Sequence, residues 1–325
     1  MNDLSLNCSI IADDIRKLSR TEWLELRRQS LGGSDISAAL GLNRWRSPME
    51  VWADKAGVPL PKQETSEACR WGILLEEIIR AEAAKRTGWT ITKPVAMYRH
   101  KTIPYLSANV DGLAQIPGKG LSVIEIKTAN SYKESEWSNG QVPPEYYLQG
   151  QHYMAVLDLA HCVFACLLGG QKMVMAEIDR DDGMISDMCR LADQFWSHVI
   201  SKTPPDPDGS EATADFLAKL YSVSPNKVPL ILPEKADALV SNWLNAKNDE
   251  DQAAEQRRLA EHELKMLIQD HERAVTPNGT AITWKTVTAG RLDSARLKKE
   301  QPAVWEQYST TAASRRFAIS EKNLH

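Results

Sequence analysis

Three residues in the middle of the chain carry side chains suited to the hydrolysis of a phosphodiester. Asp111 precedes a glycine, and Glu125 and Lys127 follow on a predicted strand. The period of two places these last two on one face and Ile124 and Ile126 on the other. Two carboxylates on adjacent strands, with the strand carbonyl of Ile126, form a site for a hard divalent cation. Lys127 can orient or deprotonate a water, or stabilise charge on the phosphate.

This pattern is the D…(D/E)-x-K signature of nucleases, and it is short. A second acidic-x-Lys triplet occurs at Glu263-Leu264-Lys265, in a charged helical region where its side chains would splay around the helix. The first triplet is favoured because it lies on a period-two strand and follows an Asp-Gly pair by a hairpin-like interval. These residues leave two interpretations open, a nuclease site and a structural surface pair between Glu125 and Lys127.

The region near the N-terminus is basic although the whole chain is not. Residues 14–46 hold seven cationic and four anionic side chains, whereas the formal net charge of the chain is −4. A turn at Gly32-Gly33 precedes Ser34 and Asp35, either of which suits the N-cap of the next helix. The backbone N–H groups of such a turn favour a phosphate, and a plain helix–turn–helix corner explains the pattern as well.

Arg44 and Arg46 flank Trp45 in the same basic region. An aromatic ring between two guanidinium groups suits stacking on frayed bases or gripping a nucleic-acid backbone. A tryptophan packed under two solvated arginines is the structural alternative, and the sequence does not separate the two.

The composition narrows the class of protein. With 325 residues and 42% hydrophobic side chains, the chain is expected to fold as about two domains of roughly 150 residues each. The five scattered cysteines and seven histidines show no paired spacing, which disfavours zinc ribbons and disulfide frameworks. No apolar run approaches the roughly 18–20 residues that span a bilayer. Residues 1–14 show no secretion signal, so a cytoplasmic location is expected.

A Pro- and Asp-rich segment, 203–209, predicts a boundary between a core of residues 1–205 and an appendage of residues 206–325. Periodicity predicts the elements of the core: a helix over 67–87, strands over 103–110 and 122–127, a helix over 146–157, a hairpin of 162–168 with 173–178, and a helix through 184–199. In the appendage, residues 234–273 predict a helical hairpin or coiled coil that turns near 245–249. A strand over 280–288 is expected to pair with 315–319.

The ordered motifs of residues 20–200 resemble the phage-type nuclease family that includes lambda exonuclease and the YqaJ-like viral recombinases, in the PD-(D/E)XK superfamily. The matching segments are Trp23-Leu-Glu-Leu-Arg27, Leu31-Gly-Gly-Ser34, Trp71-Gly-Ile-Leu-Leu-Glu76, Ser107-Ala-Asn-Val-Asp111-Gly112, Ile124-Glu-Ile-Lys127 and Tyr147-Leu-Gln-Gly-Gln151. The resemblance implies an α/β fold with a restriction-endonuclease-like core, in which helices flank a central mixed β-sheet, plus a C-terminal α+β appendage.

The resemblance also implies roles for individual residues. Asp111, Glu125 and the Ile126 carbonyl would bind the metal directly, and Glu76 directly or through water. Lys127 would be the catalytic lysine, and Gln149 would hold the attacking water or the phosphate. Arg27 and Ser34 would receive the terminal 5′-phosphate, and Gln151 would contact DNA. The loop of Arg44 and Arg46 has no firm equivalent in the family, and its expected DNA contact rests on the residue pattern alone. One departure is Asn109, which stands where the exonuclease branch can have a serine that contacts phosphate.

The expected activity is Mg²⁺-dependent 5′–3′ digestion of linear double-stranded DNA, with Mn²⁺ as a substitute. The product would be 3′ single strands for phage-type recombination through a single-strand annealing protein, and the resemblance suggests a homotrimer. Two alternatives stay open: an endonuclease of the same fold, and a non-cleaving module that binds DNA ends or a recombinase. For residues 206–325 a partner dock, a subunit contact and a DNA clamp are all consistent with the sequence.

Overall fold

The computed structural model describes residues 6–60, 66–222, 228–310 and 315–320, which form two compact units. The first unit ends at Tyr221 and the second begins at Ser222. This division lies later in the chain than the predicted boundary at residue 205. The reason is helix α7 (Glu211–Leu220), whose Phe216 is buried in the hydrophobic core of the first unit.

A five-stranded mixed sheet forms the centre of the first unit, in the order β2-β5-β6-β7-β8. Its strands are β2 (Ile91–Thr92), β5 (Gly112–Ile116), β6 (Gly120–Ala129), β7 (His161–Leu168) and β8 (Lys172–Asp179). Strands β5 and β6 form an antiparallel hairpin, as do β7 and β8, whereas β6 and β7 run parallel. The hairpin predicted from residues 162–178 is confirmed, and so is the mixed sheet.

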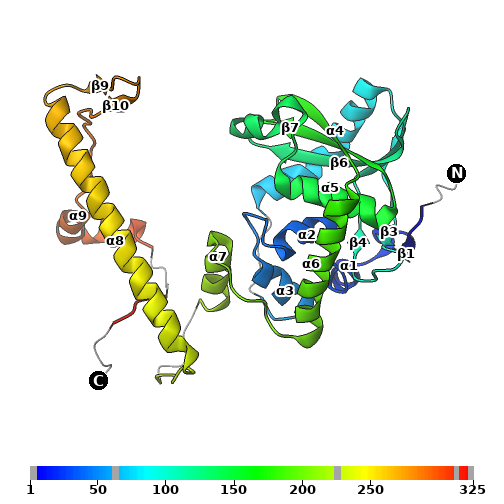
Figure 1. Ribbon diagram of the computed structural model, residues 1–325, viewed down its shortest axis with the longest axis horizontal. Helices are drawn as coiled ribbons and strands as arrows, with labels where there is room; N and C mark the ends of the chain where they lie inside the picture. The colour runs from blue at the N-terminus through cyan, green and yellow to red at the C-terminus, as the bar shows by residue number, and fades with distance from the viewer. Residues whose placement is uncertain (1–5, 61–65, 223–227, 311–314, 321–325) are drawn as a thin grey trace. The chain divides into compact units, whose positions relative to one another are not determined.

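Helices cover both faces of this sheet (Figure 1). Helix α4 (Glu67–Thr87) packs Ile79 against Ile124 and Ile126 of β6. The other face holds the larger core, which contains Val123 of β6, helix α5 (Pro144–Leu157) and, beyond it, α2 (Gly33–Ala39) and α6 (Asp182–Ser201). The predicted alternation of residues along β6 is therefore confirmed, together with the α/β class.

Helix α5 approaches the sheet closely because it carries a glycine at the contact. A Cβ added to Gly150 would lie 2.7 Å from Ile178 and 3.0 Å from Phe164. Helices α4 and α5 have the predicted extents to within two residues, and α4 ends at Gly88, whose positive φ closes the helix. On α4, Trp71 stays more than half exposed although its spacing predicted an apolar face.

Smaller elements complete the first unit. They are β1 (Ser9–Ala12), the 3₁₀ helix η1 (Ile15–Lys17), α1 (Arg20–Arg28), α3 (Pro48–Ala56), β3 (Met97–Arg99), β4 (Ser107–Ala108) and the 3₁₀ segment η2 (Ser131–Gly140). Strands β1, β3 and β4 form a second sheet. The strand predicted over 103–110 is shorter than expected, because only Ser107 and Ala108 pair with β3.

In the second unit, the predicted helical hairpin is wrong. Residues 245–249 lie inside one continuous helix, α8 (Lys235–Ile268), and do not turn the chain. Ion pairs one turn apart support this helix, such as Lys247 with Glu250 and Asp251.

The strand pairing predicted for the second unit is also wrong. Strand β10 (Ala281–Thr283) pairs with β9 (Arg273–Val275), and residues 315–320 form no strand. Helices α9 (Ser294–Glu300) and α10 (Pro302–Tyr308) follow. Across both units, none of the helices in the described part of the chain is long and apolar enough to cross a membrane.

Candidate active site

The β5–β6 hairpin brings Asp111 beside the acidic-x-Lys strand. Asp111 comes directly before β5, and its Oδ2 accepts a hydrogen bond of 2.9 Å from the backbone N–H of Ile126. The neighbouring Gly112 is required by packing, since a Cβ there would lie 2.7 Å from Ile91 and 3.1 Å from Ile124. The Asp-Gly pair is therefore explained by the close approach of β2 and β6, and it fixes the position of the Asp111 carboxylate.

Glu125, Lys127 and Gln149 form a closed triangle of hydrogen bonds. The Lys127 Nζ lies 2.7 Å from Glu125 Oε1 and 3.0 Å from Gln149 Oε1. The Gln149 Nε2, from α5, donates to the same Glu125 Oε1 at 2.6 Å. The structure thus brings together four predicted site residues, Asp111, Glu125, Lys127 and Gln149, on the sheet face that α5 covers. The nuclease interpretation of the sequence predicts that these side chains lie close together, and they do.

The charges of this group are poorly balanced. Glu125 is buried, and its Oε2 has no hydrogen-bond partner among the described residues. Burial, followed by the charge of Asp111, raises the pKa of Glu125 to about 8. Burial also raises the pKa of Asp111. For Lys127, burial acts to lower the pKa, but the two carboxylates outweigh it and raise the pKa. When both carboxyl groups are ionised, the single Lys127 ammonium leaves one negative charge unbalanced, and without a metal ion a proton on Glu125 compensates for it.

This arrangement fits a divalent cation. Two carboxylates in a partly dry site repel one another, and an added cation relieves that repulsion. The free Oε2 of Glu125 and the Asp111 carboxylate are oxygen ligands of the kind that Mg²⁺ prefers, with the Ile126 carbonyl on the intervening strand. No group of three His, Cys, Asp or Glu side chains with metal-binding geometry occurs in the described residues. With two carboxylates and one carbonyl as its protein ligands, a cation here would keep several water ligands.

Glu76 lies on α4 and belongs to a different set of ion pairs. Its Oε1 accepts from Arg80 at 3.0 Å and also from Lys93. Arg80 is buried, and it also donates to the backbone carbonyl of Asp111 at 3.1 Å, which links this set to the carboxylate site. The predicted role of Glu76 as a metal ligand stays a prediction.

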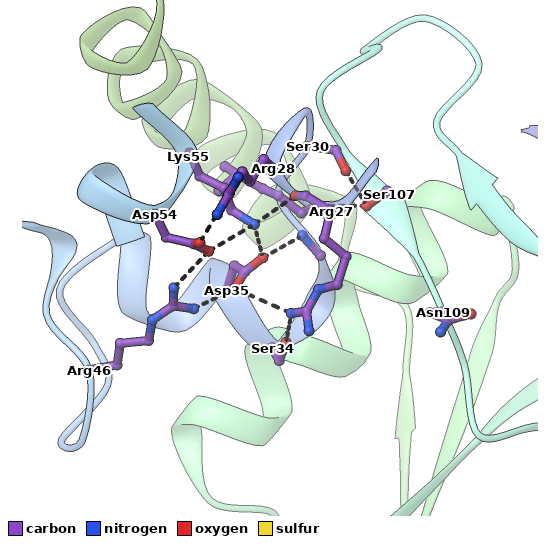
Figure 2. Close-up of polar contacts among 12 residues, drawn as sticks. Arg27, Arg28, Ser30, Ser34, Asp35, Arg46, Asp54, Lys55, Ser107 and Asn109 are labelled. Carbon is purple, nitrogen blue, oxygen red and sulfur yellow. Dashed lines mark hydrogen bonds and ion pairs between the residues drawn. The ribbon is translucent and has the colours of Figure 1, made fainter. Parts of the chain in front are cut away.

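Arg27 and Ser34, predicted to receive a terminal phosphate, lie together. The Arg27 Nη2 is 3.2 Å from Ser34 Oγ, although Arg27 lies in the last turn of α1 and Ser34 in the first turn of α2. They line a pocket of about 140 Å³, whose remaining walls are Trp23, Gly32, Gly33, Met97, Ser107, Asn109 and Tyr153. Asn109 faces this pocket, and Ser107 adds a hydroxyl that is bonded to Ser30 at 2.8 Å (Figure 2).

The sequence interpretation missed a buried charge cluster behind Arg27. Figure 2 shows the Asp35 carboxylate between Lys55, Arg46 and Arg27, at 2.7, 2.6 and 3.7 Å. Burial acts to raise the pKa of Asp35, but Lys55 and Arg46 outweigh it and hold the pKa below its usual range. Lys55 also donates to the Arg27 carbonyl at 2.8 Å. The cluster therefore fixes the end of α1 against α2.

The sequence predicts Asp35 only as a candidate helix cap, and the structure gives a different N-cap. Gly32 occupies that position, and Asp35 Oδ2 accepts its N–H at 3.2 Å. Lys55 lies on α3, where a lysine normally faces solvent, so its burial had no signal in the sequence.

The other predicted DNA contacts are engaged within the protein. Arg46 pairs with Asp35, and Arg44 pairs with Glu145 at 3.0 Å. Trp45 is 55% exposed, and Arg44 and Lys133 both lie over its ring. The structural alternative, a tryptophan packed under Arg44 and Arg46, is therefore correct for Arg44 and wrong for Arg46.

Gln151 is fully buried away from the triangle. Its Nε2 donates to the Asp179 carbonyl and its Oε1 accepts from the Asp181 N–H, both at 2.9 Å. The structure therefore brings Gln149 to the candidate active site and gives Gln151 a packing contact between α5 and the end of β8.

Comparison of the sequence with known proteins identifies the family of this chain. The model of the YqaJ-like viral recombinase domain matches residues 22–160, a range that contains every candidate residue named above. The chain is 35% identical to the uncharacterized protein YqaJ of Bacillus subtilis (strain 168) over 308 residues, which cover 94% of this chain and 95% of YqaJ. The chain belongs to the YqaJ-like viral recombinase family.

Two solved structures are also similar to this YqaJ-like chain. One is an alkaline exonuclease (LHK-Exo) from Laribacter hongkongensis, at 25% identity and a TM-score of 0.47, covering 56% of this chain and 94% of the exonuclease. The other is a phage related exonuclease from Haemophilus somnus 129PT, at 14% identity and a TM-score of 0.38, covering 55% and 99% of the two chains.

The buried carboxylates of this YqaJ-like chain predict how its metal-free form responds to pH. The folded state holds the Glu125 proton up to about pH 8, whereas the unfolded chain releases it near the ordinary value of 4.5. Between these values the folded state binds more protons, so the free energy of unfolding falls as pH rises. Urea unfolding in chelator from pH 5 to 8.5 should show a shallower fall for Glu125→Gln than for the unmodified chain. If the free energy of unfolding falls equally with pH in both proteins, the raised pKa assigned to Glu125 is wrong.

Proposed function

We propose that this chain is a metal-dependent deoxyribonuclease that digests linear double-stranded DNA from a 5′ end. The observation that carries the proposal is the convergence of Asp111, Glu125 and Lys127, in which one buried oxygen of Glu125 has no hydrogen-bond partner within the described part of the chain. Mg²⁺, or Mn²⁺ in its place, would supply charge neutralisation at the phosphodiester and a bound water of lowered pKa. Membership of the YqaJ-like viral recombinase family supports DNA as the substrate.

Lys127 would act as a cation in this reaction. Its pKa is raised by the neighbouring carboxylates, so the amine is protonated near neutral pH. An ammonium group donates hydrogen bonds and stabilises negative charge, and it does not accept a proton. Of the roles considered for this lysine, orientation of the attacking water and stabilisation of charge on the phosphate are therefore favoured over deprotonation of the water.

Gln149 would position the reacting groups. Its amide oxygen accepts from Lys127 and its amide nitrogen donates to Glu125, so both side chains are held in one orientation. Positioning of this kind lowers the activation barrier for hydrolysis, because the reacting groups are already held in the geometry that the reaction needs. Asp111 is fixed in the same way by the Ile126 N–H.

The pocket of Arg27 and Ser34 supports an exonuclease over an endonuclease. A guanidinium and a hydroxyl 3.2 Å apart, in a pocket of about 140 Å³, suit a terminal phosphate group. Only a DNA end offers such a group. The further parts of this proposal are 3′ single strands as product, a single-strand annealing protein as partner, and a homotrimer as the assembled form.

Arg27→Ala should reduce the preference for 5′-phosphorylated over 5′-hydroxyl ends by about tenfold to a hundredfold, the worth of one charge-assisted contact. The ratio of kcat/KM on the two ends measures this preference. Arg20→Ala is the matched control, because Arg20 and Arg27 both lie over the ring of Trp23 and Arg20 is not among the residues lining the pocket. Equal losses on both ends would show that Arg27 does not receive the phosphate.

The two alternatives are tested by one set of substrates. Incubation with Mg²⁺ of a linear duplex and a covalently closed circle of the same sequence should release nucleotides from the linear form alone. Cutting of the circle would favour the endonuclease. Binding to ends without release of nucleotides in Mg²⁺ or Mn²⁺ would favour the non-cleaving module.

A further inference from the structure

Tyr153 contacts both the pocket of Arg27 and Ser34 and the hydrogen-bond triangle that contains Gln149. It lies on α5, one turn after Gln149, and only 4% of it is exposed. Its side chain lines the pocket with Arg27 and Ser34. Its ring packs against Gly33, where an added Cβ would come within 2.4 Å of the Tyr153 Cε1. The glycine at the start of α2 therefore makes room for this tyrosine.

The hydroxyl of Tyr153 makes two hydrogen bonds, one toward each group. It donates its single proton to the backbone carbonyl of Asn109, a pocket residue, at 3.3 Å. With that proton engaged, the oxygen accepts from Gln149 Nε2 at 3.0 Å. A continuous chain of hydrogen bonds thus runs from the pocket wall through Tyr153 to Gln149, and from there to Glu125.

The hydroxyl also supports the one orientation of the Gln149 amide that Lys127 permits. With Nε2 bound to Tyr153 and Glu125, the Oε1 of Gln149 accepts from Lys127 at 3.0 Å. The reversed amide would direct two N–H donors at an ammonium group, which has no acceptor. Loss of the Tyr153 hydroxyl removes one of the contacts that fix this orientation.

We propose that Tyr153 is a positioning residue that couples a terminal phosphate in the pocket to the orientation of Gln149 at the reacting centre. The inference rests on the proposed nuclease function. A phosphate held by Arg27 and Ser34 contacts a wall that contains Asn109 and Tyr153, and the bonds from Asn109 to Gln149 tighten in the filled pocket. The 5′-phosphate therefore accelerates the hydrolytic step itself, in addition to strengthening the binding of the end.

Tyr153→Phe tests this coupling, because it removes the hydroxyl and keeps the ring against Gly33. Single-turnover hydrolysis is measured with enzyme in excess, on duplexes with 5′-phosphate and 5′-hydroxyl ends. End binding is measured by fluorescence anisotropy in chelator. The variant should keep the binding preference for 5′-phosphate and lose about tenfold in rate on the phosphorylated end, so that both ends react at similar rates. Tyr105→Phe, which loses a hydroxyl bonded to Asp193, is the matched control and should keep both properties.

Thermal melts establish that each variant is folded, and Gly33→Ala provides a second approach. Its added methyl must displace the Tyr153 ring, so it should also abolish the phosphate-dependent gain in rate. A Tyr153→Phe enzyme that keeps the gain would overturn the inference, as would unmodified enzyme that cleaves both ends equally fast. Unmodified enzyme that releases no nucleotide with Mg²⁺ or Mn²⁺ would instead overturn the proposed function, and the inference with it.

Discussion

Lys127→Ala is expected to abolish hydrolysis while the chain still binds DNA ends. The amine lies 2.7 Å from Glu125 and 3.0 Å from Gln149, so its removal deletes the only cation of the triangle. The pocket of Arg27 and Ser34 is formed by other elements and stays intact. The loss in kcat should be roughly a hundredfold to ten-thousandfold, as for a positioned group that acts on protons or developing charge. Single-turnover rates and end binding in chelator measure the two effects separately.

The control for this variant is the second acidic-x-Lys triplet. Lys265→Ala changes the equivalent lysine of that triplet, which lies on α8 and pairs with Glu261. It should leave the rate of hydrolysis unchanged. If Lys127→Ala and Lys265→Ala have equal activity, or if Lys127→Ala loses DNA binding as well, the catalytic role assigned to Lys127 is wrong.

Asp111→Asn is expected to weaken metal binding and eliminate cleavage. The asparagine carbonyl can still accept the N–H of Ile126, so the hairpin should keep its geometry and lose one negative charge. Loss of a direct ligand should cost more than the roughly 10–100-fold in metal affinity that removal of an outer partner costs. Titration calorimetry with Mn²⁺ and Mg²⁺ measures the affinity, and nucleotide release measures the activity.

Asp187→Asn provides the comparison, since Asp187 is an exposed carboxylate paired with Arg190 on α6. It should bind metal and cleave DNA as the unmodified chain does. Unchanged metal affinity in Asp111→Asn would place the cation elsewhere in the protein. Retained cleavage in this variant would remove Asp111 from the reaction.

The sequence predicts the site best where local patterns determine structure. Strand β6 alternates apolar and charged residues, and Asp111 directly precedes its partner strand, so pairing of β5 and β6 brings Asp111 to Glu125. Helix α5 is buried along most of its length and carries Gln149 in its first half. These elements follow from periodicity and turn signals within about 40 residues of one another.

Contacts that depend on how helices pack were not predictable in this way. Asp35 and Lys55 lie on different helices, and only the packing of α2 against α3 buries their ion pair. In helix α8 a local pattern was misleading. The polar residues near 245–249 suggest a turn, but ion pairs between side chains one turn apart support a continuous helix. A residue such as Tyr153, which acts through others, has no motif of its own.

The most direct test of the central claim is digestion of a linear duplex that carries a different label at each terminus of both strands, followed over time with Mg²⁺ and with chelator. We expect stepwise loss of the 5′ labels in Mg²⁺, persistence of the 3′ labels on single strands, and no reaction in chelator. Release that continues in chelator would contradict the metal site at Asp111 and Glu125. Release that begins at the 3′ termini would contradict recognition of the 5′ end.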